Sequence, residues 1–386
     1  MSFLDGLTVL DLASVGPAAR ASRTLADYGM NIIKVAPVSA KGAKQIDPVF
    51  HAYGAGRGTQ KIRVDLKSDE GKQVIYQLAK SVDVVIESYR PGVAARLGVG
   101  YEDLKAINPQ IVYCSTSGYG QDGPYAQWAG HDLNYLAVGG FLACSGTDAE
   151  GIPTIPGATV ADSAGGGMHA AMSIIAALLN RFRKNEGAYL DVSATDGVLG
   201  LMSLYLDQYT ATGVETKPNN AVLTGMYGWY GVYKTSDGKA ITLGAIEPHF
   251  FKNLCRLLAL EEFNDAQYDA SRQEAMKAAF KAKFLTNSRD HWTRLLAAAD
   301  TCMAPVLSVA EVVENEHLLA RNTFMKAVHP EKGEFRQLAP ILAGCDRNHP
   351  TYHLKPAGST DTREVLAKAG LSSSEIQRLF DGGVVE

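Results

Sequence analysis

The stretch LTVLDLASVGPAARASRTLADYGMNIIKV, residues 7–35, decides the fold class of this chain. Its first six residues are mostly apolar and rich in β-formers, and NIIKV at residues 31–35 has the same character. Between them, residues 17–28 carry Ala, Leu and Arg at helical spacing. Two short strands that flank a helix form a β-α-β unit, which implies a parallel sheet. The sequence therefore predicts an open α/β layer structure.

The same alternation continues to about residue 210. A helix at residues 68–80 opens with Ser-Asp-Glu, a good N-terminal signature. The segment at residues 164–180 is apolar and rich in small residues, which predicts a buried helix. The other predicted elements are strands at residues 82–86, 110–114 and 189–193 and a long helix at residues 197–210.

The alternation of single strands with helices ends after residue 210. Residues 211–225 are predicted to be a linker, and residues 226–321 a small α+β domain. This domain begins with a predicted hairpin, whose strands at 229–234 and 240–243 are joined through Ser-Asp-Gly-Lys. It continues with predicted helices near 247–258, 271–285 and 289–299 and a strand at 303–307. A last helix is predicted at residues 373–380.

Composition narrows the class of protein. The 386 residues are 46% hydrophobic and 20% charged, which is ordinary for a globular protein. A net charge of −4 provides no broad basic field, so we expect neither a nucleic-acid partner nor a membrane partner. The five cysteines are far apart and odd in number, and no signal peptide is recognised. These features predict a cytoplasmic enzyme with reduced thiols.

Several common motifs are missing. The first β-α turn, at residues 13–17, lacks GxGxxG, which argues against a dinucleotide-binding cradle. The chain contains no GxxxxGK[ST], no GxSxG and no HExxH. P-loop NTPases, α/β-hydrolases of the usual type and zinc proteases of that signature are therefore disfavoured.

Three short motifs each place an ionisable residue at a predicted loop-to-helix junction. They are AGHDLNY at 129–135, ADSAGGG at 161–167 and GAIEPHF at 244–250. Such junctions expose backbone N–H groups and the positive end of a helix. Each residue also has a purely structural interpretation: Asp162 as an N-cap, Glu247 as a first-turn carboxylate and His131 as a core histidine.

The glycine run at residues 165–167 is harder to explain by helix propensity. Each glycine early in a helix costs up to about 1 kcal/mol relative to alanine. The run becomes understandable if something bulky lies against the backbone there.

These motifs resemble the family III CoA-transferase superfamily, and most closely its α-methylacyl-CoA racemase branch. The resemblance covers nearly the whole chain, and residues 87–135 are its most specific part. It rests on LDGLTVLDLA, VDLKSDEGK, ESYRPGVAARLGVGYEDL, TSGYGQDGPYAQWAGHDLNYLA, ADSAGGG, GAIEPHFF and APVLSVAEVVENEHLLAR.

The resemblance implies an interlocked homodimer. Each chain would have a large Rossmann-like domain, residues 1–210, to which residues 322–386 return, and a small domain in the middle. Long linkers would let the two chains thread through each other. In that arrangement Glu247 would face His131 and Asp162 across the subunit boundary.

The resemblance also implies a chemistry: epimerisation of the α-carbon of 2-methyl-branched acyl-CoA thioesters, a reaction of lipid metabolism. Proton removal and return with inversion need one acid–base group on each face of a planar intermediate. The resemblance assigns these roles to His131 and Asp162. Glu247 would orient His131, and the backbone N–H of Asp132 would stabilise the enolate oxygen. No metal or organic cofactor is implied, because CoA is part of the substrate.

Coenzyme A carries several negative charges that must be met locally. Arg90 and Arg96 match family positions near the coenzyme, although both could be solvated surface residues. The racemases usually carry an Arg, or an acidic residue and Pro, after the second strand. Here that strand continues as KVAPV, and Lys34 is a candidate substitute for the usual contact.

Two other functions remain open at this point. A transferase could move CoA between carboxylic acids with Asp162 as nucleophile, but the small domain lacks the glycine-rich loop that family transferases typically carry. A non-catalytic acyl-CoA-binding protein is the second alternative. The sequence does not choose between short, long branched and steroid acyl groups.

Overall fold

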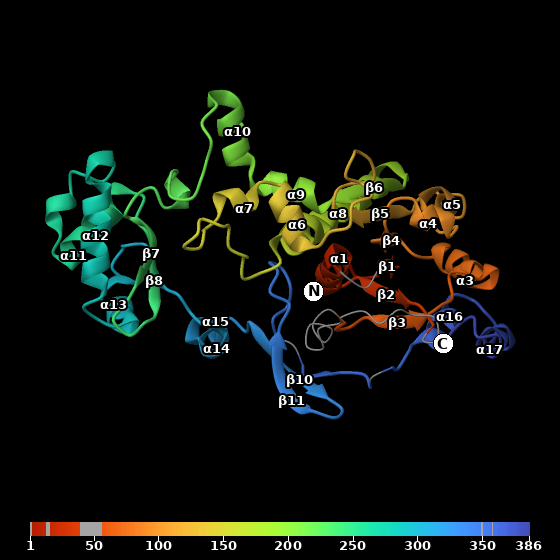
Figure 1. Ribbon diagram of the computed structural model, residues 1–386. Helices are drawn as coiled ribbons and strands as arrows, with labels where there is room; N and C mark the ends of the chain where they lie inside the picture. Colours follow the sequence, from red (N-terminus) through yellow and green to blue (C-terminus); the bar gives the residue numbers. More distant parts are fainter. Residues whose placement is uncertain (1, 13–15, 39–55, 349, 357) are drawn as a thin grey trace. The chain divides into compact units, whose positions relative to one another are not determined.

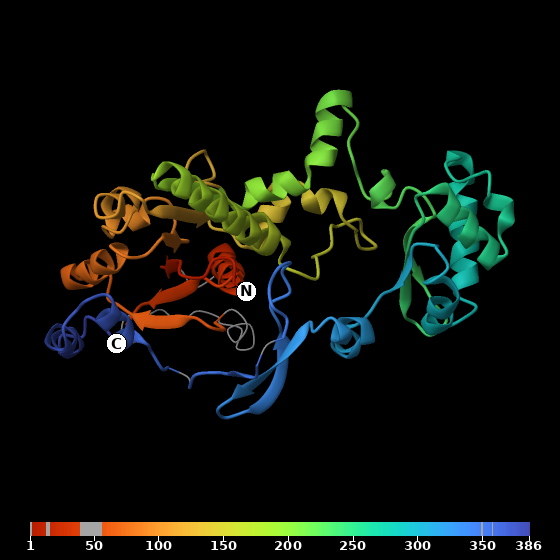
Figure 2. The same ribbon diagram turned by 180° about the vertical axis from the view of Figure 1, so that it is seen from behind.

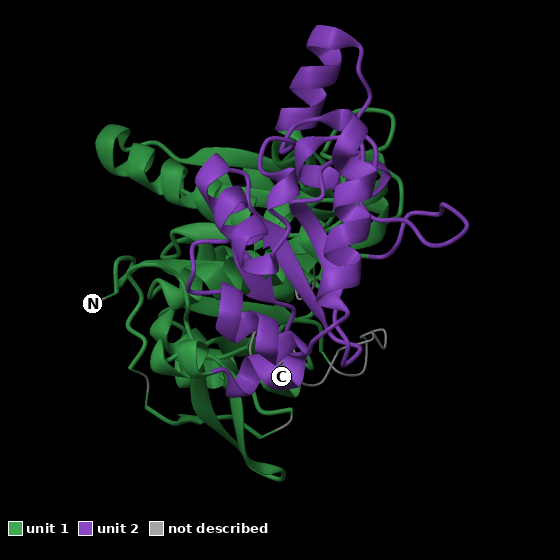
Figure 3. Cartoon of the chain, turned by 90° about the vertical axis from the view of Figure 1, so that its left-hand side faces the viewer, with its two compact units in different colours: residues 1–139, 156–203, 316–386 green, residues 140–155, 204–315 purple. Residues whose placement is uncertain are grey.

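The computed structural model describes residues 2–12, 16–38, 56–348, 350–356 and 358–386 (Figure 1). Residues 13–15 of the first β-α turn lie outside the described part. The chain divides into two compact units, coloured separately in Figure 3. Unit 1 comprises residues 1–139, 156–203 and 316–386, and unit 2 comprises residues 140–155 and 204–315.

Unit 1 is built on a six-stranded parallel sheet. Its strand order is β3-β2-β1-β4-β5-β6, and each neighbouring pair is parallel. This is the doubly wound strand order. The order in which strands are added to the sheet reverses between β1 and β4, and in such sheets ligands bind at the carboxyl ends of the strands beside that point. The strands are β1 (Thr8–Asp11), β2 (Asn31–Ala36), β3 (Gln60–Arg63), β4 (Val84–Glu87), β5 (Val112–Ser117) and β6 (Ala188–Ser193).

Helices cover both faces of this sheet and bury a separate apolar core on each. One core joins the sheet to α1 (Gly16–Asp27) and α8 (His169–Lys184), which lie side by side in Figures 1 and 2. The other joins it to α3 (Asp69–Ala79), α5 (Tyr101–Lys105), α16 (Thr362–Lys368) and α17 (Ser373–Asp381). Period-2 burial along the strands explains the two cores, because successive side chains point to opposite faces.

The predicted β-α-β unit and its parallel sheet are confirmed. The sequence missed β3, whose QKIR is polar, and the hairpin of β10 (Phe324–His329) and β11 (Gly333–Leu338). A short β12 (Tyr352–His353) pairs with β10. These strands need partners from distant parts of the chain, so local pattern gives little signal for them.

Two predicted helices differ from the structure. The helix at residues 197–210 is two helices, α9 (Ala194–Leu201) and α10 (Ser203–Thr212), because the backbone of Met202 departs from helical geometry. The buried helix predicted at 164–180 is buried on one face only and does not begin as an α-helix. A π-helical segment, η2 (Ala161–Met168), precedes α8, and α8 buries only the face that packs on the sheet.

The last part of unit 1 returns to the large sheet. The backbone N–H of Lys61 in β3 donates to Asp361 Oδ2 at 2.8 Å, and Val64 forms an isolated bridge with Val385. Among the remaining short helices, α4 (Val93–Arg96), α6 (Asp132–Val138) and α15 (Glu316–Ala320) also belong to this unit.

Unit 2 has its own core around Trp229 and Trp292. The predicted hairpin is confirmed as β7 (Tyr230–Lys234) and β8 (Ala240–Gly244), and β9 (Met303–Pro305) joins it. The other helices are α7 (Phe141–Cys144), α11 (Pro248–Leu258), α12 (Gln273–Phe284), α13 (Arg289–Leu296) and α14 (Val309–Glu314). The sequence-based boundaries did not include residues 140–155 in the small domain, whereas the compact unit does. Within the described ranges, no helix combines the length and apolar character needed to cross a bilayer.

Candidate active site

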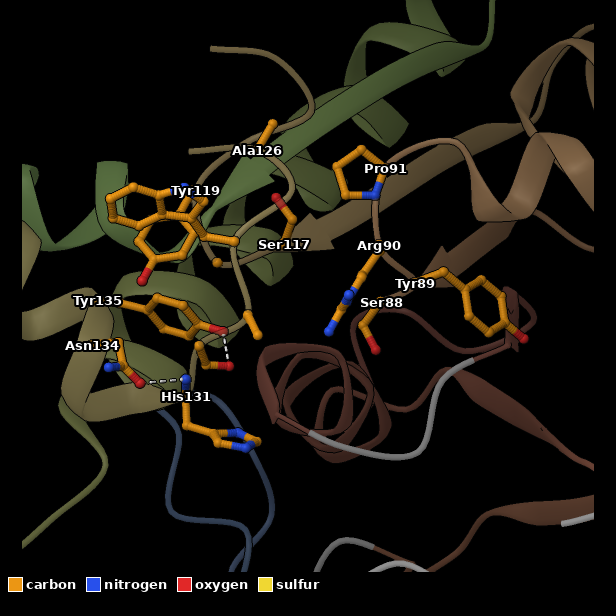
Figure 4. A pocket seen from close by; sticks show the side chains of 14 residues that line it. Ser88, Tyr89, Arg90, Pro91, Ser117, Tyr119, Ala126, His131, Asn134 and Tyr135 are labelled. Carbon is orange, nitrogen blue, oxygen red and sulfur yellow. Dashed lines mark hydrogen bonds between the residues drawn. The ribbon is translucent and has the colours of Figure 1, made fainter. Parts of the chain in front are cut away.

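A pocket of about 390 Å³ opens at the carboxyl edge of the sheet in unit 1 (Figure 4). Its walls come from the turn after β4, the loop after β5 and the start of α6, so it lies where a doubly wound sheet places its ligands. The residues that line it are Ser88, Tyr89, Arg90, Pro91, Ser117, Gly118, Tyr119, Ala126, Trp128, Ala129, Gly130, His131, Asn134 and Tyr135.

His131 lines this pocket as the N-cap residue of α6. Its backbone N–H donates to Asn134 Oδ1 at 3.0 Å, which fixes the start of the helix. The side chain is exposed, so the interpretation as a core histidine is wrong. Within the described part of the chain, no hydrogen bond engages the imidazole, which leaves both ring nitrogens available to a ligand.

Asp132 and Asp162 are brought together by a backbone contact. The N–H of Asp162 donates to Asp132 Oδ1 at 2.8 Å and thereby links the first turn of α6 to the first turn of η2. The N–H of Asp132 is a first-turn donor without an intrahelical acceptor. Among the described residues no acceptor for it is found, so this donor is free to meet a ligand oxygen.

Asp162 lies inside η2, whose N-cap is Val160. The interpretation of Asp162 as an N-cap is therefore wrong. Burial raises the pKa of Asp162 above its ordinary value, and Arg20 opposes that rise, with 3.9 Å between Arg20 Nη1 and Asp162 Oδ2. Asp132 adds to the rise in pKa and His131 lowers it, so both groups lie close enough to act on the Asp162 charge. π-Helical segments of this kind are often found at functional sites.

The glycine run in η2 is explained by neighbouring helices. A Cβ on Gly166 would lie 2.6 Å from the Pro17 ring, and one on Gly167 would lie 2.6 Å from Arg20 Cβ, both on α1. On the other side, a Cβ on Gly165 would lie 2.7 Å from the Ala194 carbonyl oxygen of α9. The bulky neighbour predicted from the sequence is therefore α1 and α9, and their close approach also brings Arg20 to Asp162.

The three candidate CoA-binding cations lie in different surroundings. Arg90 is exposed and lines the pocket, and among the described residues it has no ion-pair partner. Arg96 ends α4 and is exposed outside the pocket lining, with Nη1 near Gly92. Lys34 lies in β2, with Nζ 4.0 Å from Oδ2 of the buried Asp11. Contact of Arg90, Arg96 and Lys34 with CoA stays a prediction.

Glu247 belongs to unit 2. It is the exposed N-cap residue of α11, with Pro248 in the first turn, and its side chain makes no capping hydrogen bond. It is therefore not the first-turn carboxylate that the sequence allowed as a structural alternative. Its pairing with His131 stays a prediction.

Sequence reasoning gave no role to an aromatic cluster in the pocket. Tyr125 and Trp128 stack at 3.9 Å, and Tyr119 meets Tyr135 edge-on at 5.1 Å. Tyr135 donates its hydroxyl to the Gly130 carbonyl, and burial raises its pKa to about 12. The signal was present, since GYGQDGPYAQWAGHDLNY is rich in aromatics, but only the fold gathers them into one wall.

The pocket wall contains His131 and the unpaired Arg90, and the Asp132 N–H and the Asp162 carboxyl group belong to segments next to it. In the part of the chain that the structure describes, no group of His, Cys, Asp and Glu could hold a metal ion. The arrangement can bind an anionic, partly apolar ligand and can exchange protons with it.

The fold and the pocket define a doubly wound α/β protein with acid–base groups at the carboxyl edge of its sheet. The sequence model of "CoA-transferase family III" matches residues 4–361. The alpha-methylacyl-CoA racemase of Homo sapiens is 31% identical over 384 residues, which cover 99% of this chain and 97% of that protein. The succinyl-CoA:glutarate CoA-transferase of Mus musculus is 28% identical over 401 residues, covering 100% and 91%.

Solved structures agree with this assignment. A CaiB/BaiF family protein from Brucella suis has a TM-score of 0.70 and 29% identity, covering 83% of this chain and 88% of that one. The chain belongs to CoA-transferase family III.

Proposed function

We propose that this protein is an α-methylacyl-CoA racemase, which epimerises the α-carbon of 2-methyl-branched acyl-CoA thioesters. The observation that carries the proposal is the hydrogen bond from the Asp162 N–H to Asp132, the neighbour of His131 in the pocket wall, which holds Asp162 close enough to His131 for the His131 charge to act on the Asp162 pKa. An imidazole and a carboxyl group supply the two different acid–base groups that inversion at one carbon needs. The 31% identity to racemases over 99% of the chain supports it further.

In the proposed reaction, neutral His131 removes the α-proton from one face. The electron pair of the broken C–H bond moves to the thioester oxygen and forms an enolate. Protonated Asp162 then delivers its proton to the opposite face, which restores the carbonyl with inverted configuration. The raised pKa of Asp162 favours the protonated form that this step requires. For the other epimer the two roles are exchanged.

The enolate oxygen needs a fixed donor. The first-turn N–H of Asp132, at the positive end of α6, would supply it. Donors of this kind contribute typically about 10²–10³-fold in rate. Glu247 of a second subunit would orient the His131 ring and fix its tautomer. CoA enters as part of the substrate, so no separate cofactor takes part in the proposed steps.

A homodimer is part of the proposal, and exposed apolar side chains support it. Met168, at the end of η2, and Met172, Leu179 and Phe182 on α8 are each more than half exposed, and they follow one another at helical spacing. α10 has no buried residue although it carries Leu204, Leu206 and Tyr209. An apolar stripe of this size needs a cover, and a second copy of the chain is the proposed one. Light scattering should give twice the chain mass, and Phe182→Glu should shift the protein towards monomer.

A CoA-transferase is the second candidate. The curated transferases at 28–30% identity favour it, as does a carboxylate at Asp162 that could attack a thioester. The α-hydrogen separates the two activities. Incubation of a 2-methylacyl-CoA in deuterated water should give α-deuterium without any acceptor acid. Trapping of an acyl adduct on Asp162 by hydroxylamine, with no exchange, would refute racemisation and favour transfer.

The acyl group is to be identified by experiment. A panel of short, long branched and steroid 2-methylacyl-CoA epimers, resolved by chiral chromatography, would rank the substrates. A His131→Ala variant that binds and turns over normally would instead support the third alternative, a non-catalytic acyl-CoA-binding protein.

A further inference from the structure

Glu87 is a buried carboxylic acid that the proposed reaction does not use. It is the last residue of β4 and is 3% exposed. Burial, the largest cause, raises its pKa to about 7. Within the described ranges it has no Lys or Arg partner. An isolated carboxylate buried in this way costs stability at neutral pH, which indicates a role other than stabilising the fold.

The contacts of Glu87 lead directly to the pocket wall. Its Oε2 accepts the backbone N–H of Tyr89 at 2.6 Å, and its carboxyl group is also hydrogen-bonded to the Ser115 side chain. Its own carbonyl accepts the Thr116 hydroxyl at 3.1 Å. Glu87 is thus fixed to β5 on one side and holds the turn after β4 on the other.

No cation relieves the charge of Glu87 from the strands around it. The titratable groups that face the carboxyl group or share its surroundings are Asp11 from β1, Tyr113 and Cys114 from β5, Tyr189 and Asp191 from β6, and Tyr89 from the turn itself. All of these are neutral or acidic. The carboxyl group therefore binds the turn by hydrogen bonding alone.

The turn at residues 88–91 is held at two points. The Tyr89 ring packs against the core on one face of the sheet, and the Tyr89 N–H is held by Glu87. In Figure 4 the Tyr89 ring points away from the pocket, whereas the Arg90 side chain points into it. The direction of the Arg90 side chain therefore depends on the same peptide that Glu87 holds.

We propose that Glu87 is a positioning residue, whose carboxyl group holds the turn at residues 88–91 so that Arg90 meets the phosphate-bearing part of bound coenzyme A. The inference rests on the proposed function for its ligand. Arg90 makes the contact with the anion, and Glu87 acts only through it. Removing the carboxylate weakens the hold on the Tyr89 N–H, since a charged acceptor binds an amide more strongly than a neutral one.

The test is a double-mutant cycle on coenzyme A binding, measured by isothermal titration calorimetry. At pH 8.5, where Glu87 is ionised, Glu87→Gln should raise the Kd about tenfold, because a hydrogen bond to a charged group is replaced by a weaker neutral one. In the Arg90→Gln background the same substitution should change the Kd less than about twofold, since the group through which it acts is gone. Independent effects that multiply in the double variant would overturn the inference, and so would a Kd for Glu87→Gln within twofold of wild type.

The test is completed by comparing the effects on KM and kcat and by a control variant. Glu87→Gln should raise the KM for the acyl-CoA while kcat changes little, because Glu87 does not touch the reacting carbon. Glu102→Gln removes an exposed carboxylate from the start of α5 and should leave both constants unchanged. A fall in kcat at constant KM would contradict the positioning role.

The outcomes also separate this inference from the proposed function. A wild-type protein that binds coenzyme A but exchanges no α-proton refutes racemisation and leaves the role of Glu87 intact. A wild-type protein that does not bind coenzyme A overturns the role of Glu87.

Discussion

Replacing Glu87 by glutamine should make the protein more stable at pH 8 and leave its stability nearly unchanged at pH 4.5. The carboxyl group is 3% exposed, and burial raises its pKa from 4.5 to about 7. Glutamine has nearly the same size, and its amide oxygen can still accept the Tyr89 N–H. The substitution therefore removes the cost of ionisation and keeps the packing.

The sign follows from proton linkage. Between pH 4.5 and 7 the folded state holds the Glu87 proton and the unfolded state has released it. The free energy of unfolding therefore falls as pH rises through this window and is level above it. Each pKa unit corresponds to about 1.4 kcal/mol, so the full loss is roughly 3 kcal/mol. For a compact unit as large as unit 1, a loss of this size in the free energy of unfolding corresponds to a Tm difference of about 6 °C.

Differential scanning calorimetry from pH 4.5 to pH 8.5 would measure the effect. The Tm of Glu87→Gln should exceed that of wild type above pH 7, and the two should converge towards pH 4.5. The pKa of Asp162 is also raised, but by burial and by neighbours other than Glu87, so Asp162 contributes equally to both proteins and cancels in the difference. A Tm difference that is independent of pH, or a variant that is less stable at pH 8, would refute the reasoning.

Three further results are expected. His131→Ala and Asp162→Asn should each lower racemisation by about 10²–10⁴-fold, the usual contribution of a general acid or base, as measured by chiral chromatography; a loss under tenfold would contradict the two-base scheme. Arg20→Gln removes the cation 3.9 Å from Asp162, so the pKa of that carboxyl should rise further. The acidic limb of the kcat/KM profile should then move to higher pH for the epimer from which Asp162 takes the proton, and an unmoved limb would exclude that assignment. Gly197→Ala should destabilise the protein by about 3 kcal/mol, because the new Cβ would lie 1.8 Å from a backbone oxygen of η2. Gly200→Ala, with open space around the new Cβ, is its control, and equal thermal unfolding of the two variants would contradict the packing argument.

Much of the fold was accessible from local pattern. Strong apolar strands such as β1, β2 and β4 alternate with amphipathic helices, and this predicted the parallel sheet. β3 was missed because QKIR has a single buried apolar residue, and its pairing with β2 decides its conformation. The β10–β11 hairpin was missed for a similar reason, since apolar and polar residues do not alternate in FMKAVH or GEFRQL and the two strands depend on each other for pairing.

For the candidate site, too, the sequence indicated some features and the structure was needed for others. His131, Asp162 and Glu247 were singled out from the sequence because each lies in a recognisable motif at a predicted helix start. Arg90 was found by resemblance and lies in the pocket wall. Lys34 was proposed for a phosphate contact, and only the structure places its ammonium group beside the buried Asp11.

The sequence by itself determined the alternation of strands and helices in the large unit, the family and the residues able to move a proton, because these depend on side-chain chemistry and on spacing within a few residues. Tertiary structure alone decided the environments of those residues. Arg20 meets Ser163, 143 residues away, and Glu87 loses its solvent only when β1 and β5 pair with β4 on its two sides. Burial and electrostatic neighbours arise from contacts between distant segments, and these set the pKa values that the proposed chemistry uses.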